Sequence, residues 1–208
     1  MKPAGGGGLP PVHNPEEHIM HALSRRNAFV LAAVLSAIMW LTRGNHFASP
    51  VHLPDASWAI FFLAGFYFRP RAMLPLFLAQ AALVDCLATT QFGVSNYCVT
   101  PAYIFLLPAY SALWLAGRWF AAHYRLHART LPYFVAAALA GTAVCELVSS
   151  GSFYFLGGRF ADSSLGEFGS RLVQYFPADL GGAAFYLGCV AAIHFLITSF
   201  RHTHPAAQ

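Results

Sequence analysis

Charged residues are scarce in this 208-residue sequence: they make up 10% of the chain, whereas a soluble domain carries about 25%. This shortage excludes an ordinary soluble domain. Together with 57% hydrophobic residues and a mean hydropathy of +0.53, it indicates a membrane protein, with the lipid bilayer as its main surroundings. The net charge of +4 does not indicate a nucleic-acid partner, because the basic residues lie at the ends of apolar runs.

Cysteine is also scarce, with four residues and no CxxC pair. That pattern gives neither a zinc signature nor a disulfide framework. Cys86, Cys145 and Cys189 lie within apolar runs, and we expect them to pack as small hydrophobic side chains. Cys98 differs, because it lies in a polar gap between two apolar runs.

A cleavable signal peptide is not evident, because the first apolar run begins only after Arg25 and Arg26. Residues 1–24 contain GGGG and two adjacent prolines, and we interpret them as a disordered or artificially added leader. Residues 25–201 are then one transmembrane domain, and residues 202–208 form a tail.

Six apolar segments of helical character follow the leader, and they predict an all-α membrane protein with six transmembrane helices. The second segment is the shortest, and we expect Asp55 to cap it. The predicted helices are 27–41, 57–68, 72–92, 101–121, 131–150 and 178–200.

The basic residues predict the orientation, because Lys and Arg collect in cytoplasmic loops. Nine of the 12 fall on one side of the predicted bundle, which places both termini in the cytoplasm. The nine are Lys2, Arg25, Arg26, Arg69, Arg71, Arg118, Arg125, Arg129 and Arg201, and the other three are Arg43, Arg159 and Arg171.

The outer loops of this topology are 43–55, 93–100 and 151–177. Residues 165–176 in the third form an amphipathic piece suited to the membrane interface or to a lid. The residues that carry chemistry collect on this outer face, and they are His46, His52, Asp55 and Cys98.

Cys98 precedes Thr100 and Pro101, which predict the cap and the first residue of a helix. A thiol near a helix N-terminus lies at the positive end of the macrodipole, which favours the thiolate. Pro-Ala-Tyr occurs twice, so Tyr103 and Tyr110 fall on one stripe beneath the cysteine. The alternative role for Cys98 is that of a small buried hydrophobic residue.

Three acidic residues lie toward the outer side of predicted helices: Asp85, Glu146 and Asp179. A carboxylate inside a membrane helix costs roughly 2.5–3.5 kcal/mol, so it usually faces a polar cavity or a partner. We expect a shared outward-facing cavity, with structural hydrogen bonds between helices as the alternative. His46 follows the turn signal Gly44-Asn45, which would direct its ring over that cavity.

Three features of the chain resemble the BtuM family of cobalamin transporters, relatives of the substrate-binding S-components of energy-coupling factor (ECF) importers. They are HFASPVHLPDASWAIFFLAGFY, LVDCLATTQFGVSNYCVTPAYIFLLPAY and the six-helix layout. The resemblance covers nearly the whole chain after residue 26. It implies an S-component-like bundle in the bacterial inner membrane that binds cobalamin from the periplasmic side.

The resemblance also implies roles for individual residues. Cys98 would be the axial ligand of the corrin cobalt, and Asp85, Tyr103 and His46 would lie around the corrin, with His46 as a second candidate metal ligand. Electron donation from the sulfur would promote loss of cyanide from cyanocobalamin, particularly after reduction of the cobalt.

The first helix carries the small-xxx-small pattern Ala33-x-x-x-Ala37, which permits close helix approach. The resemblance makes this pattern the surface that would meet ECF coupling and ATPase subunits.

Two other classes of protein fit the same residues. One is a membrane-embedded thiol enzyme, with Cys98 as nucleophile and His46 or His52 as base. The other is a sensory or scaffolding membrane domain with a cavity that performs no chemistry. A bound corrinoid would colour the purified protein, whereas the other two classes would be colourless.

Overall fold

The computed structural model describes residues 24–43, 53–93, 95–125 and 128–203, and within these ranges the chain forms helices and no strand. The α-helices are α1 (Arg25–Arg43), α2 (Ser57–Tyr67), α3 (Met73–Gln91), α4 (Leu106–His123), α5 (Leu131–Leu156) and α6 (Leu165–Thr203). The short 3₁₀ helices are η2 (Asn96–Cys98), η3 (Pro101–Phe105) and η4 (Ala128–Thr130).

The helix α2 is the centre of the fold. It has 11 residues, eight of them buried, and it contacts all five other α-helices. A helix that is apolar on all sides is buried by its neighbours, because no face gains from water. At 1.5 Å per residue it is roughly 16 Å long, about half of a 30 Å hydrocarbon core. The segment predicted as a short membrane span is therefore a core helix too short to cross a bilayer alone.

Two glycines allow α2 and α4 to cross with their backbones in contact. A Cβ on Gly65 would lie 2.0 Å from the carbonyl oxygen of Trp114, and a Cβ on Gly117 would lie 2.0 Å from that of Phe62. Real Cβ atoms do not approach so closely, so only glycine fits at either position. Gly141 on α5 makes a similar approach to α4, since a Cβ there would lie 2.8 Å from Cβ of Ala116.

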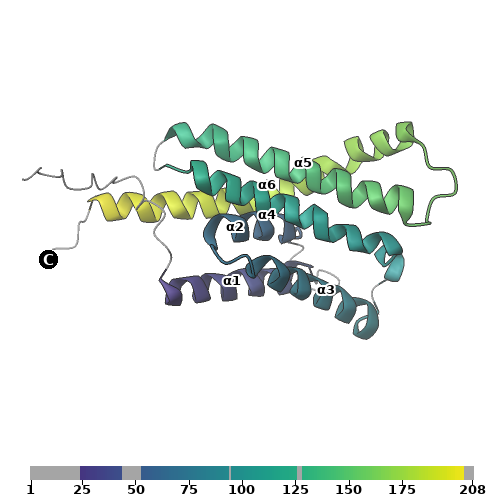
Figure 1. Ribbon diagram of the computed structural model, residues 1–208, viewed down its shortest axis with the longest axis horizontal. Coiled ribbons are helices and arrows are strands. Elements are labelled where there is room, and N and C mark those ends of the chain that lie inside the picture. The colour runs from purple at the N-terminus through teal and green to yellow at the C-terminus, as the bar shows by residue number, and fades with distance from the viewer. Residues whose placement is uncertain (1–23, 44–52, 94, 126–127, 204–208) are drawn as a thin grey trace, which may run out of the picture.

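The helices lie along the long axis of the molecule (Figure 1). The helices α4 and α5 run side by side along one edge, α1 and α3 lie along the opposite edge, and α2 lies between them. The start of α1 and the end of α6 lie at one end of the bundle, and η2, η3 and the start of α6 lie at the other.

Four helical segments are long and apolar enough to cross a membrane: Met73–Gln91, Pro101–His123, Leu131–Leu156 and Leu165–Ile197. Most of their residues are not buried in the protein, and large apolar side chains such as Ile104, Leu107 and Phe195 are exposed. So large an apolar surface is typical of contact with lipid. The described chain therefore has the character of a multi-pass membrane protein, with four spans supported by length and hydropathy.

The largest difference from the sequence prediction lies between residues 150 and 178. The predicted outer loop 151–177 is mostly helical, because α5 continues to Leu156 and α6 begins at Leu165 with Pro177 inside it. Neighbouring helices and local adjustments satisfy the backbone groups that such a proline frees in a membrane helix. The helix α6 also continues to Thr203, past the predicted start of the tail at residue 202.

Candidate functional site

Arg43, the last residue of α1, forms a buried ion pair with Asp85 of α3. Its Nε lies 2.7 Å from Oδ1 of Asp85 and its Nη2 lies 2.6 Å from Oδ2, which is a bidentate pair. The Arg43 side chain is 8% exposed and that of Asp85 is 26% exposed. Charge-assisted bidentate bonds of this kind are among the strongest hydrogen bonds in proteins.

The remaining donor group of Arg43 binds α2 and α4. Its Nη1 donates to Oγ of Ser57 at 2.9 Å and to the hydroxyl oxygen of Tyr110 at 2.7 Å, and it lies 3.6 Å from Oδ2 of Asp55. Asp55, which was predicted to cap α2, accepts from the backbone N–H of Ser57 at 2.9 Å, although the N-cap residue of α2 is Ala56. One guanidinium thus joins four helices.

Tyr103 completes this cluster from η3. Its hydroxyl donates to Oδ2 of Asp85 at 2.7 Å. Tyr103 and Tyr110 both reach the Arg43–Asp85 pair, as their seven-residue spacing predicts. The Asp85 carboxylate accepts from three donors, so Arg43 and Tyr103 fix its position.

The turn that carries Cys98 lies directly before this cluster in the chain. Thr100 is the N-cap of η3 with Pro101 at its first turn, and η3 continues into α4. The predicted helix start is therefore correct, although it is a 3₁₀ turn and the Thr100 side chain makes no capping hydrogen bond. Cys98 ends the separate turn η2, whose backbone is described although the Cys98 side chain is not. His46 and His52 lie outside the described residues.

A small cavity lies between α5 and α6. It measures about 80 Å³ and is lined by Glu146, Ser150, Phe153, Tyr154, Phe160, Phe168, Arg171 and Leu172. The Glu146 side chain accepts from Oγ of Ser150 at 2.7 Å. Of the three acids expected to share one cavity, only Glu146 lines this one, whereas Asp85 is paired with Arg43 and Asp179 is exposed.

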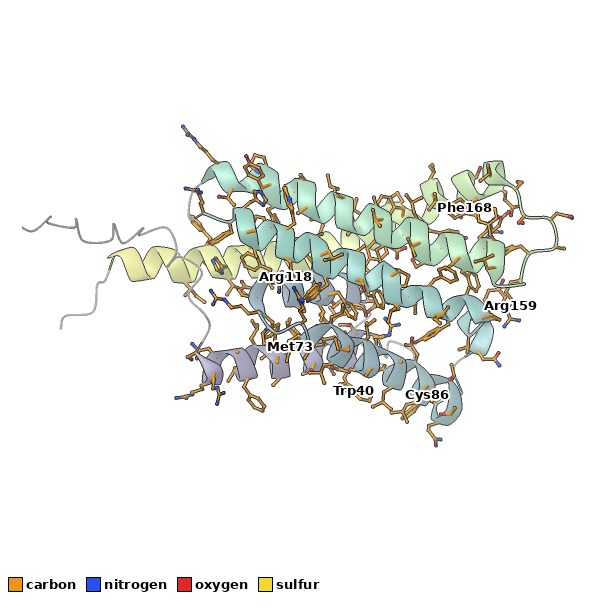
Figure 2. The ribbon with its side chains drawn as sticks, in the orientation of Figure 1. Trp40, Met73, Cys86, Arg118, Arg159 and Phe168 are labelled. Atoms are coloured by element: carbon orange, nitrogen blue, oxygen red, sulfur yellow. The ribbon has the colours of Figure 1, made fainter. Side chains whose placement is uncertain are left out.

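The other cysteines divide into two kinds. Cys145 is buried as predicted, but Cys86 and Cys189 are exposed, so the expectation that they pack inside was wrong. Figure 2 shows Cys86 on the outer edge of α3. A small apolar thiol is tolerated on a surface that faces lipid, which explains why an apolar segment did not imply a buried cysteine.

His194 of α6 packs at the other end of the bundle. Its Nδ1 lies 3.0 Å from the Tyr67 hydroxyl and its Nε2 lies 2.7 Å from the Tyr124 hydroxyl. Burial raises the pKa of the Tyr124 hydroxyl above its ordinary value. The contacts of His194 with Tyr67 and Tyr124 join α6 to α2 and to the end of α4.

On α1, Ala33 and Ala37 are both exposed, on the outer surface of the bundle. Phe29 and Val34 of the same helix are exposed as well. The small-residue pattern is therefore accessible to another helix.

Arg43 is the residue that the sequence prediction placed wrongly, since it was assigned to an outer loop. A signal for its burial was present: a lone arginine closes the apolar run 27–42, and Asp85 stood without a basic partner. An intramembrane acid favours a nearby base, because pairing lowers the cost of burying both charges.

Among the described residues no group of three or more His, Cys, Asp or Glu side chains is arranged to hold a metal ion. Comparison of the sequence with protein-family models and with curated proteins gives no match.

Proposed function

We propose that this protein binds cobalamin in the bacterial inner membrane and takes it up, with the Cys98 thiolate as an axial ligand of the cobalt. The observation that carries the proposal is the hydrogen bond between Tyr103 and Asp85. These two residues, selected from the sequence as corrin neighbours, meet at the start of the helix that follows the Cys98 turn.

The donor chemistry near Cys98 fits a corrinoid as substrate. A thiolate is a soft, strong donor, and a corrin leaves only axial positions open for exchange at its cobalt. Tyr97, Val99 and Ile104 are exposed apolar residues close to Cys98 in the chain, and they supply the kind of surface that a flat macrocycle covers.

The size of a corrinoid limits where it can bind on this protein. Pockets for drug-sized ligands measure about 300–1,000 Å³, whereas the cavity at Glu146 measures about 80 Å³. A corrinoid would therefore bind at the end of the bundle that carries η2 and η3, and not inside this cavity.

Decyanation follows as ligand exchange. The Cys98 sulfur would displace the tethered benzimidazole from one face of the cobalt, and its electron donation there would weaken the bond to cyanide on the opposite face. Cyanide leaves with the electron pair of that bond and takes up a proton, so the oxidation state of the cobalt is unchanged. His46 is proposed as a second group near the corrin.

The test is the visible spectrum of cyanocobalamin mixed with the purified protein. We expect the wild type to bind the corrinoid, shift its spectrum and release cyanide. Cys98→Ser should abolish the shift and the release, because an alcohol is a much poorer donor than a thiolate, while part of the binding remains. Cys86→Ser is the matched control on α3 and should behave as the wild type.

Two results would count against the proposal. A colourless wild type that binds no corrinoid would contradict cobalamin binding, and an unchanged spectrum in Cys98→Ser would contradict the axial ligand alone. Growth of a host that depends on external cobalamin and lacks its own importer then tests uptake, with and without this chain.

The proposed orientation places both termini in the cytoplasm and the Cys98 turn in the periplasm. A reporter that is active only outside the cytoplasm should work when fused after Gly93 or Gly158, and not when fused after His127. We further propose the exposed Ala33 and Ala37 of α1 as the contact for ECF coupling and ATPase subunits. Their replacement by leucine should reduce uptake and leave corrinoid binding intact.

A further inference from the structure

Three aromatic side chains pack together on the outside of α4 and α5. The centroid of the His123 ring of α4 lies 4.3 Å from that of Trp119 and 6.0 Å from that of Tyr133 of α5, and the planes of His123 and Tyr133 differ by 15°. Nδ1 of His123 also lies 2.8 Å from the carbonyl oxygen of Trp119. All three side chains are nevertheless exposed, Trp119 by 45% and Tyr133 by 48%. They form a surface that the described part of the chain does not cover.

This aromatic surface lies where two apolar segments end. His123 is the last residue of the segment Pro101–His123, and Tyr133 is the third residue of the segment Leu131–Leu156. Tryptophan and tyrosine are enriched at the two surfaces of a membrane, because an apolar ring with a polar group suits the level of the lipid headgroups. The three rings are therefore placed to contact lipid near its phosphate and glycerol groups.

The same end of the bundle carries exposed arginines. The start of α5 lies at the end that also holds the start of α1 (Figure 1), and Arg25, Arg26 and Arg129 are exposed there. The ion pairs found between described residues involve other arginines. The sequence also has no Asp or Glu between residues 86 and 145, so Arg129 has no acidic neighbour nearby in the chain. The positive charge at this end therefore fits an anion from outside the protein.

We propose that Trp119, His123, Arg129 and Tyr133 form a binding site for the headgroup of an acidic phospholipid, here called the α4–α5 corner. Arg129 lies four residues before Tyr133, about one helical turn, so both belong to the start of α5. The guanidinium of Arg129 binds the lipid phosphate, an anion that arginine matches in geometry and charge. The rings pack on the glycerol and on the first methylene groups of the acyl chains.

A lipid fits this surface better than an acidic protein does. Trp119 and Tyr133 lie within apolar segments long enough to span a membrane, where the surroundings are lipid. Basic side chains near the membrane surface attract anionic lipids, and each contributes a factor of about five in affinity. The α4–α5 corner therefore combines a charge that selects acidic lipids with rings that hold the lipid at one place.

The test is native mass spectrometry of the full-length protein in detergent, which counts the lipids that remain bound. Phosphatidylglycerol and phosphatidylcholine with the same acyl chains are added in equal amounts. We expect the wild type to retain phosphatidylglycerol in preference. Arg129→Gln should lower this retention about fivefold, because it removes one cation from the site. Arg129→Lys should keep most of it, because lysine preserves the charge.

The matched control is Arg26→Gln at the start of α1. It removes one exposed arginine at the same end of the bundle but on the opposite edge, so it should leave the retention nearly unchanged. Trp119→Leu keeps every charge and should weaken retention through the loss of the ring. Glycerol phosphate, which lacks acyl chains, should not displace the lipid. Thermal unfolding shows which variants are folded, and where Arg129→Gln is not, Trp119→Leu and the wild-type preference decide.

Three results would overturn the proposal. Equal retention of the two lipids by the wild type would leave the α4–α5 corner to another partner, such as an acidic protein. Equal losses in Arg129→Gln and Arg26→Gln would show a general attraction to this end without a site. Displacement by glycerol phosphate would show that a free phosphate group is enough. None of these measurements involves cobalamin, so the lipid site and the proposed function can fail independently.

Discussion

Two carboxylates in this protein, one half-buried and one buried, have opposite surroundings. Asp85 accepts from two nitrogens of Arg43 and from the Tyr103 hydroxyl. Glu146, which is 5% exposed, has Ser150 as the one hydrogen-bond donor found for its carboxylate among the described residues. The first carboxylate is neutralised by a cation, and the second lines a small cavity.

The two carboxylates therefore differ in what the loss of their charge does to the protein. A fully paired ion pair fixes the relative positions of the helices that carry it, and removing one partner leaves the other charge buried. A weakly paired carboxylate tolerates the loss of its charge, since neutralisation removes a desolvation cost. Asp85 therefore acts by holding Tyr103 and α1 in place. The four predictions that follow test this contrast, from the largest expected effect to the smallest.

Arg43→Met should have the largest effect. It leaves Asp85 without its cation and removes four hydrogen bonds that join α1 to α2, α3 and α4. Breaking a buried pair in this way costs about 3–5 kcal/mol. We expect a steep fall in thermal stability in detergent and in the yield of folded protein.

The double variant Arg43→Met with Asp85→Asn is the informative control, because it removes both charges. It should recover part of the stability that Arg43→Met loses. Arg171→Met, which breaks only an exposed pair, should change the stability little. A loss of similar size in Arg43→Met would show that the buried pair contributes little.

Asp85→Asn should have the second largest effect. The amide keeps one oxygen as acceptor but leaves Arg43 with Asp55, 3.6 Å away, as its nearest remaining counter-charge. Hydrogen bonds to charged groups contribute about 1.5–3 kcal/mol, so we expect a loss of that order. Thermal unfolding measures this loss of stability. Corrinoid binding per folded molecule should fall as well. Unaltered corrinoid binding with reduced stability would show that Asp85 has a structural role only.

Tyr110→Phe should cost less, about 1 kcal/mol. The ring stacks on Phe61 with centroids 4.4 Å apart, and phenylalanine keeps that contact while it removes the hydroxyl that accepts from Arg43. Nη1 of Arg43 still has Ser57 as an acceptor. Thermal unfolding again provides the measurement. Tyr110→Leu, which also removes the stacking on Phe61, should lower the thermal stability clearly more than Tyr110→Phe.

Glu146→Gln should have the smallest effect, below about 1 kcal/mol. The amide oxygen of glutamine can still accept from Ser150, and no cation is left unpaired. We expect near-normal unfolding and near-normal corrinoid binding. A loss as large as that of Asp85→Asn would refute the contrast between the two carboxylates.

The sequence was informative wherever a local rule decides the structure. Thr100 and Pro101 predicted a helix start, and the spacing of Tyr103 and Tyr110 predicted that they act together. The unbroken apolar character of α2 also carried a signal, since a helix without a polar face belongs in a core. The sequence prediction nevertheless took this segment as a span, whereas the helix has only 11 residues in the structure.

Features that depend on tertiary packing could not be predicted in the same way. The Arg43–Asp85 bond joins residues 42 positions apart, and no local pattern specifies that pairing. Pro177 suggested a helix boundary, but packed neighbours can carry a helix through a proline. The contact of Arg159 with the carbonyl oxygen of Tyr97 likewise depends on how the α5–α6 connection meets η2, which only the folded chain shows.

The crossing of α2 and α4 limits how this chain can vary over evolution. A side chain at Gly65 or Gly117 would meet backbone atoms, which cannot change rotamer to make room. A substitution there would force the two helix axes apart, and α2 would shift against all five helices around it. Any homologue that shares this crossing should carry glycine at both positions. The pair is therefore a two-residue sequence signature by which relatives of this fold can be recognised before their structures are known.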